Sequence, residues 1–187
     1  MALVPVNLPN TITVIRVLLV PLFVIYLQKH LFMLSLIVFT VAAISDALDG
    51  MVARFFNQRT SLGAYLDPIA DKMLLVSAFI TLSIQGIIPF WLSVVVISRD
   101  ILILTGVLIC TMADIKVTIQ PSIISKFTTV AQLLTVFISL LYQVISPTLS
   151  TNWTHALYGV TSILTIISGL HYIYKGLNIH QNSSENH

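Results

Sequence analysis

The sequence is divided into six long apolar runs, which are separated by short polar or turn-forming stretches. The runs cover about residues 11–28, 31–55, 62–86, 88–110, 122–146 and 153–176. Each is close to the ~20 residues that a helix needs to cross a hydrocarbon core ~30 Å thick. The 57% hydrophobic and 9% charged content also lies far from that of soluble globular domains. The sequence therefore predicts an all-α, polytopic membrane protein with six transmembrane helices.

The few charged residues indicate an orientation and exclude one class of partner. A net charge of +2 without a basic stripe gives no sign of nucleic-acid binding. Lysine and arginine near span ends mark the cytoplasmic side. A cytoplasmic N-terminus leaves only Lys29 outside and places these residues on the inner side: Arg54, Arg59, Lys116, Lys126 and Lys175. We therefore expect one membrane domain over residues 1–177 in a bacterial inner membrane, followed by a polar, disordered tail over 178–187.

Four of the seven acidic residues lie in the second and third apolar runs. They are Asp46, Asp49, Asp67 and Asp71. The first two are spaced i,i+3 and the last two i,i+4, so each pair shares one face of its helix. Carboxylates crowded together beside lipid repel one another strongly, and such a cluster usually signals bound cations. The pattern predicts a cation site near the cytoplasmic ends of these two spans.

Small residues and one arginine accompany these acids. Gly50, Ala53 and Gly63 would allow a bulky ligand to approach the backbone closely, and Arg54 lies one helical turn beyond Asp49. Carboxylates prefer Mg²⁺ or Mn²⁺, and a guanidinium group can bind phosphate oxygens with two donors. Together these residues favour a metal-bound ligand that carries phosphate.

The spacing D-x2-D-G-x2-A-R-x8-G-x3-D-x3-D resembles the complete signature of the CDP-alcohol phosphatidyltransferases. The resemblance extends to about Leu134. It implies transfer of the phosphatidyl group of CDP-diacylglycerol to a glycerol-type lipid acceptor, with release of CMP. The four aspartates would hold two divalent cations, Mg²⁺ or Mn²⁺, and Asp71 would be the general base. The resemblance also implies CDP-binding roles for Gly50, Ala53, Arg54 and Gly63, with Asn10 and Thr13 beside the cytidine.

The alternative for the N-terminal stretch is that Asn10 caps the first helix. Later in the chain, Arg99 and Asp100 lie near the middle of the fourth span, where they either line a substrate cavity or tie helices together. The fifth span opens with a polar stripe that could bind the acceptor or bond neighbouring helices. The candidate acceptor-binding residues are Arg99, Ser125, Lys126, Thr129 and Gln132.

Phosphatidylglycerol is the expected acceptor, which would make the product cardiolipin. Glycerol 3-phosphate is a dianion and calls for several convergent basic groups, whereas few cations surround the candidate acceptor cavity. The alternative is glycerol 3-phosphate, as in phosphatidylglycerophosphate synthases. A small cation transporter and a purely structural membrane subunit are more remote alternatives. A homodimer is a further expectation.

Overall fold

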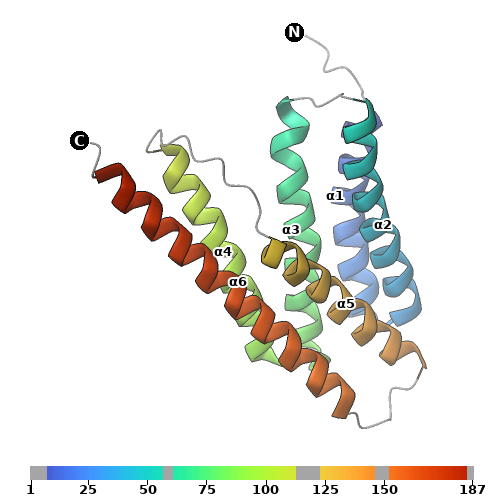
Figure 1. Ribbon diagram of the computed structural model, residues 1–187. Coiled ribbons are helices and arrows are strands. Elements are labelled where there is room, and N and C mark those ends of the chain that lie inside the picture. The colour runs from blue at the N-terminus through green and yellow to red at the C-terminus, as the bar shows by residue number, and fades with distance from the viewer. Residues whose placement is uncertain (1–7, 57–60, 113–122, 146–151, 185–187) are drawn as a thin grey trace. The chain divides into compact units, whose positions relative to one another are not determined.

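The computed structural model describes residues 8–56, 61–112, 123–145 and 152–184. Side chains are described at residues 15, 17–45, 72–106, 124–145 and 153–174. The described residues form six helices and no strand (Figure 1). The helices are α1 Leu8–Gln28, α2 Phe32–Phe56, α3 Ser61–Ile84, α4 Phe90–Met112, α5 Ile123–Ile145 and α6 Asn152–Ser184. The all-α prediction is confirmed for the part of the chain that the structure describes.

Each predicted apolar run corresponds to one helix. The largest difference is at the end of α6, which continues as a helix to Ser184. The expectation of a disordered tail from residue 178 is therefore wrong for residues 178–184, whose polar composition does not prevent them from extending an existing helix. Prolongation adds one hydrogen bond for each residue fixed and needs no new nucleus.

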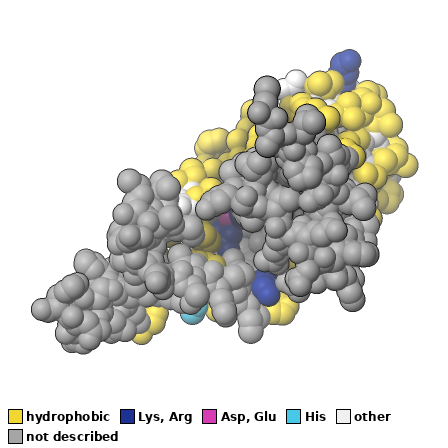
Figure 2. Space-filling view, turned by 90° about the horizontal axis from the view of Figure 1, so that it is seen from above, with side chains coloured by type: hydrophobic (Ala, Val, Ile, Leu, Met, Phe, Trp, Pro, Cys, Tyr) yellow, Lys and Arg dark blue, Asp and Glu magenta, His cyan; other side chains and the backbone are white. Residues whose placement is uncertain are grey.

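Two described segments are long and apolar enough to cross a membrane, Ile124–Ile145 and Trp153–Tyr174. Shorter apolar segments occur at Val17–Gln28, Phe32–Ser45 and Lys72–Ile84. On the face drawn in Figure 2, most of the described side-chain surface is hydrophobic, and charged side chains appear at only a few points. These features suit a membrane-associated protein, whereas the predicted count of six spans stays a prediction.

Two helices end in the same type of hydrogen-bonded turn. At the end of α1, the Leu31 N–H donates to the Tyr26 carbonyl at 3.0 Å and the His30 N–H donates to the Leu27 carbonyl at 3.0 Å. His30 adopts a left-handed conformation with φ of 57°. This pattern of bonds is the Schellman motif, in which glycine is the preferred residue because it has no Cβ to clash. The α1–α2 connection therefore places a histidine where a glycine would be less strained.

The matching turn at the end of α3 contains the expected glycine. Gly86 has φ of 70°, and its N–H donates to the Ser83 carbonyl at 3.0 Å. The Ile87 N–H donates to the Leu82 carbonyl at 2.9 Å. This turn lies between the predicted apolar runs 62–86 and 88–110, so the predicted break between them is confirmed.

The chain divides into two units, Met1–Ile88 with Val136–Leu149, and Pro89–Thr135 with Ser150–His187. In the first unit, α1 lies against α2 and α3 (Figure 1). Phe23 of α1, Phe39 of α2 and Phe79 of α3 are fully buried or nearly so. The rings of Phe23 and Phe39 have centroids 5.8 Å apart. Apolar packing thus holds α1 against the two helices that contain the signature residues.

The second unit contains α4, the first half of α5 and α6. Helices α4 and α6 run side by side in the same direction (Figure 1). The interior of this unit is lined by polar side chains that are buried, whereas large hydrophobic side chains such as Ile101, Val130 and Ile163 are exposed. Within this unit, the buried polar residues on α5 and α6 are Ser125, Thr128, Gln132, Thr135, Thr161, Ser162, Thr165 and Ser168. A polar interior with an apolar exterior is the arrangement expected when lipid surrounds the helices.

Candidate active site

The signature residues lie on two helices of the first unit. Asp46 and Asp49 belong to α2, and Asp67 and Asp71 belong to α3. Asp49 precedes the end of α2 at Phe56 by seven residues, and Asp67 follows the start of α3 at Ser61 by six. At 1.5 Å per residue, these positions lie about 10 Å and about 9 Å from the connection between the two helices. Because α2 contacts α3, the backbone places the two acidic pairs at similar heights on neighbouring helices.

The side chains of the signature lie outside the described side chains, so their predicted roles stay predictions. This applies to the metal-binding and catalytic aspartates and to the CDP-binding residues Asn10, Thr13, Gly50, Ala53, Arg54 and Gly63. The described side chains contain no group of three or more histidine, cysteine, aspartate or glutamate residues that could hold a metal ion. The four aspartates do fit Mg²⁺ or Mn²⁺ by donor type, because both ions prefer carboxylate oxygens.

Arg99 of α4 is the centre of a buried polar cluster in the second unit. Its side chain is 4% exposed, and its Nη1 donates to Oδ1 of Asp100 at 2.7 Å. Its Nη2 donates to the hydroxyl of Ser125 on α5 and to the hydroxyl of Ser168 on α6, the latter at 2.9 Å. The Nε of Arg99 is buried and has no hydrogen-bond partner among the described residues. The Arg99 guanidinium group therefore joins three helices, and its Nε–H remains available to donate a hydrogen bond.

Gln132 lies on the same buried stripe of α5 and is fully buried. Its Nε2 donates to the hydroxyl of Thr165 on α6 at 3.3 Å. Its Oε1 is buried and finds no partner within the described part of the chain. A buried carbonyl oxygen left unpaired is costly, so this atom is a candidate to accept a hydrogen bond from a ligand.

Further hydroxyl contacts hold α5 against α6. The Thr128 hydroxyl contacts the carbonyls of Ile124 and Leu164 at 2.9 and 3.1 Å. The hydroxyl oxygens of Thr135 and Thr161 are 2.7 Å apart. Thr128 and Thr135 lie beside the predicted polar stripe, and the stripe residues Ser125 and Gln132 also bond neighbouring helices, as one interpretation of the sequence predicted.

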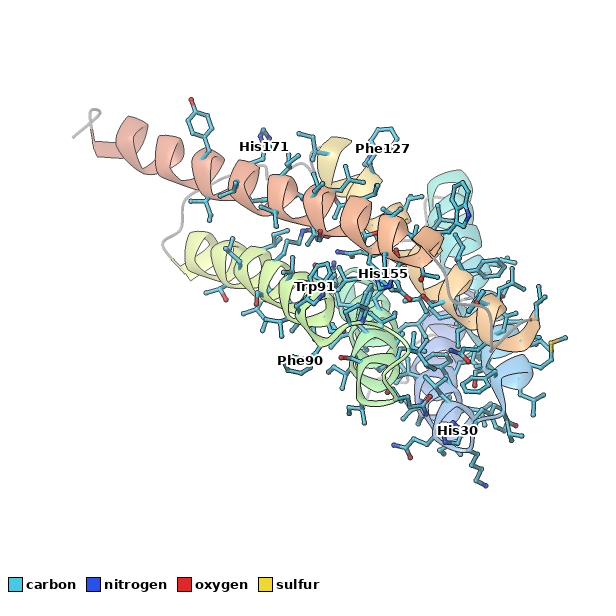
Figure 3. All side chains as sticks on the ribbon, turned by 90° about the horizontal axis from the view of Figure 1, so that it is seen from below. His30, Phe90, Trp91, Phe127, His155 and His171 are labelled. Carbon is cyan, nitrogen blue, oxygen red and sulfur yellow. The ribbon has the colours of Figure 1, made fainter. Side chains whose placement is uncertain are left out.

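The structure brings together three of the five predicted acceptor-binding residues. Arg99, Ser125 and Gln132 are buried in the interior of the second unit. Lys126 is exposed, and so is its neighbour Phe127, which projects outward from α5 (Figure 3). Thr129 is partly exposed and its hydroxyl donates to the Ser125 carbonyl of its own helix at 3.1 Å.

Sequence reasoning missed the contribution of α6. Thr161, Thr165 and Ser168 are spaced i,i+4,i+7, which places all three on one helix face. All three are fully buried, and each contacts a polar side chain of α4 or α5. In contrast, His171 of the same helix is exposed and points away from α4 (Figure 3). The spacing of the three hydroxyls was the signal that could have identified this face.

Comparison with known proteins assigns the class of protein. The sequence model of the CDP-alcohol phosphatidyltransferase family matches residues 6–168. The chain therefore belongs to the CDP-alcohol phosphatidyltransferase family, as the aspartate signature predicted, and it is an enzyme. The match continues into α6, beyond the expected limit at Leu134.

Similar relatives carry two different names. A "Probable phosphatidylglycerophosphate synthase" from Mycobacterium tuberculosis is 32% identical over 91% of this chain and 82% of its own length. A "CDP-diacylglycerol--glycerol-3-phosphate 3-phosphatidyltransferase" from Wigglesworthia glossinidia brevipalpis is 39% identical over 90% of this chain and 93% of its own length. The human "Cardiolipin synthase (CMP-forming)" is 30% identical over 92% of this chain and 62% of its own length. The family is thus shared by relatives named for different reactions.

Proposed function

We propose that this enzyme transfers the phosphatidyl group of CDP-diacylglycerol to phosphatidylglycerol, which forms cardiolipin and releases CMP. A hydroxyl oxygen of the acceptor forms a new bond to the phosphorus on the lipid side of the pyrophosphate. The bond between that phosphorus and the oxygen that leaves with CMP breaks at the same centre. Asp71 takes the proton of the acceptor hydroxyl as general base.

The observation that carries the choice of acceptor is the composition of the polar interior of the second unit. Among the described residues, Arg99 is the one cationic side chain buried there, and it is paired with Asp100. The other polar groups that surround it are hydroxyls and an amide. A phosphodiester with a single negative charge requires fewer cations than the dianion of glycerol 3-phosphate. The interior therefore favours a lipid acceptor whose uncharged glycerol headgroup carries hydroxyl donors.

The signature residues have separate roles in this proposal. Asp46, Asp49, Asp67 and Asp71 would hold two Mg²⁺ or Mn²⁺ ions, which supply charge neutralisation at the pyrophosphate when bound. Arg54 would bind a phosphate oxygen, and the small residues Gly50, Ala53 and Gly63 would admit the nucleotide close to the backbone. The side chains of Asn10 and Thr13 would lie beside the cytidine. The similar heights of the two acidic pairs on α2 and α3 support this arrangement.

Glycerol 3-phosphate is the second candidate acceptor. The names of several similar relatives favour it, since those proteins are named for phosphatidylglycerophosphate synthesis or for transfer to glycerol 3-phosphate. Arg99 could bind the phosphate of glycerol 3-phosphate if a second cation also contacted that phosphate. Family membership favours both transferase reactions over a cation transporter or a purely structural subunit.

We also propose six membrane spans with a cytoplasmic N-terminus, in a bacterial inner membrane. The homodimer belongs to the same proposal. Bacterial relatives and two clear apolar segments support the membrane setting. The topology can be measured with single cysteines placed in the connections after replacement of Cys110, because only cysteines on the outer side react with an impermeant thiol reagent in intact cells.

The acceptor can be tested with purified protein in mixed detergent micelles. CDP-diacylglycerol is supplied with phosphatidylglycerol or with glycerol 3-phosphate in separate reactions, and CMP is measured together with the lipid product. We expect CMP and cardiolipin with phosphatidylglycerol. If glycerol 3-phosphate supports turnover and phosphatidylglycerol does not, the second candidate is the correct one. Absence of CMP with both acceptors would exclude the proposed reaction.

A further inference from the structure

Arg99 of α4 and Gln132 of α5 each have a buried atom without a hydrogen-bond partner among the described residues, and both side chains are held by α6. Ser168 accepts a hydrogen bond from Arg99, and Thr165 accepts one from Gln132. Thr165 and Ser168 lie three residues apart, so they are neighbours on one face of α6. No functional role is predicted for either residue by the signature.

The bonding of Thr165 determines which way the amide of Gln132 points. The Thr165 hydroxyl donates its single proton to the Thr161 carbonyl of its own helix at 2.7 Å. Toward Gln132 it can therefore act only as an acceptor, and the group that faces it must be the amide NH₂. The carbonyl oxygen Oε1 then points elsewhere, and it is the atom without a partner among the described residues. Thr165 thus presents Gln132 as a hydrogen-bond acceptor.

Ser168 and Ser125 likewise fix the orientation of the Arg99 side chain. Each hydroxyl accepts a hydrogen bond from Nη2, and Nη1 is occupied by Asp100. Three contacts from three directions fix the plane of the guanidinium group. The Nε–H that has no described partner is then a donor of fixed direction, suited to an oxygen of a phosphate.

The contacts that hold the two groups are spaced roughly 4.5–10 Å apart along the helices that make them. Arg99 contacts α5 at Ser125, which precedes Gln132 by seven residues, or ~10 Å along the helix. On α6 the contacts are three residues apart, or ~4.5 Å. A glycerol unit joined to a phosphate extends over a comparable length and offers both an anionic oxygen and hydroxyl donors.

We propose that Thr165 and Ser168 are positioning residues, which orient Gln132 and Arg99 toward a phosphoglycerol acceptor. The phosphate oxygen accepts from Arg99, and a glycerol hydroxyl donates to Oε1 of Gln132. This inference rests on the proposed function, and it names the recognition chemistry that phosphatidylglycerol and glycerol 3-phosphate share. It also gives α6 a role in acceptor specificity.

The test measures acceptor and donor kinetics for Ser168→Ala and Thr165→Val in the full-length protein. Ser162→Ala is the matched control, because Ser162 is a buried serine of the same helix whose hydroxyl donates to the Gly159 carbonyl at 2.8 Å. CMP release is recorded against acceptor concentration at saturating CDP-diacylglycerol, and then against CDP-diacylglycerol at saturating acceptor. Both acceptors are assayed, and thermal unfolding is recorded for every variant.

We expect the KM for the acceptor to rise about tenfold in each variant, since one well-placed hydrogen bond contributes about this factor. The KM for CDP-diacylglycerol should stay within about twofold of wild type. Ser168→Thr and Thr165→Ser keep the hydroxyl, so the KM for the acceptor in these variants should stay close to that of the wild type. The Ser162→Ala control should leave the KM for the acceptor and the KM for CDP-diacylglycerol unchanged.

Three results would overturn the inference. An unchanged acceptor KM in both variants would show that α6 does not position the acceptor. An equal loss of rate with both substrates, accompanied by a lower unfolding temperature than the control, would show a structural role alone. A wild-type protein that releases no CMP with either acceptor would refute the proposed function, and the inference would fall with it.

Discussion

Replacing Arg99 by methionine tests whether its buried cluster stabilises the second unit as a coupled pair. The substitution removes the contact with Asp100 and the two contacts with Ser125 and Ser168. The side chains of Arg99 and Asp100 are 4% and 3% exposed, so solvent screens their interaction little. Removing one partner of a buried ion pair typically costs 3–5 kcal/mol, roughly, because the other charge loses its compensation.

For a chain of this length, 1 kcal/mol corresponds to roughly 2–4 °C in Tm, so Arg99→Met should lower Tm by roughly 6–20 °C. The measurement is thermal unfolding of purified protein in micelles, followed by tryptophan fluorescence. Lys126→Met is the control, because it removes an exposed cation from the neighbouring helix and should have little effect.

A double-mutant cycle separates coupling from simple loss of contacts. Asp100→Asn removes the opposing charge, so Arg99→Met with Asp100→Asn should be less destabilising than the sum of the two single changes, by about 1–3 kcal/mol. Effects that add to within about 0.5 kcal/mol would show that the two charges act independently. A change in Tm for Arg99→Met no larger than that of the Lys126→Met control would refute the reasoning altogether.

Three further predictions concern the catalytic residues and the turns. Asp71→Asn should lower CMP release by about 10²–10⁴ while metal-dependent binding of CDP-diacylglycerol persists, and near-normal turnover would exclude Asp71 as the base. Chelation should abolish activity, and Mg²⁺ or Mn²⁺ but not Ca²⁺ alone should restore it, because compact octahedral ions suit a two-metal site; full activity in excess chelator would reject the metal site. His30→Gly should raise and Gly86→Ala should lower the free energy of unfolding by about 1 kcal/mol each, since both positions have positive φ; equal signs in thermal unfolding would contradict this explanation.

The helices could be predicted from the sequence because each depends on the length of an apolar run and on the residues that interrupt it. Gly86 is such an interruption, and the structure ends α3 in a turn that suits glycine. His30 lies in the gap between the predicted runs 11–28 and 31–55, but nothing in its residue type specifies its positive φ. The end of α6 could not be predicted, because hydropathy gives no signal where a polar segment continues a helix that is already formed.

The candidate site was predicted unevenly. The aspartates of α2 and α3 stand out in the sequence because charge is rare in apolar segments, and the family match agrees with their signature. Their side-chain geometry stays a prediction. Arg99, Ser125 and Gln132 were selected as a polar group, and the structure places all three in the interior. The partners on α6 were not selected, since hydroxyl residues are common in membrane helices and their spacing reveals a face without revealing its neighbour.

The hydroxyl bonds within single helices have a consequence for biosynthesis. Thr40, Thr81, Thr105 and Thr165 each donate to the carbonyl four residues earlier, so these side chains are satisfied before any helix meets another. Arg99 and Asp100 of α4 differ, because one charged residue near the centre of an isolated helix costs about 2.5–3.5 kcal/mol on the translocon scale. The hydroxyl partners of Arg99 lie on α5 and α6, which are synthesised later. In the proposed six-span topology, release of α4 into lipid should therefore be delayed until the last helix has emerged from the ribosome, and truncation before α6 should leave α4 poorly inserted.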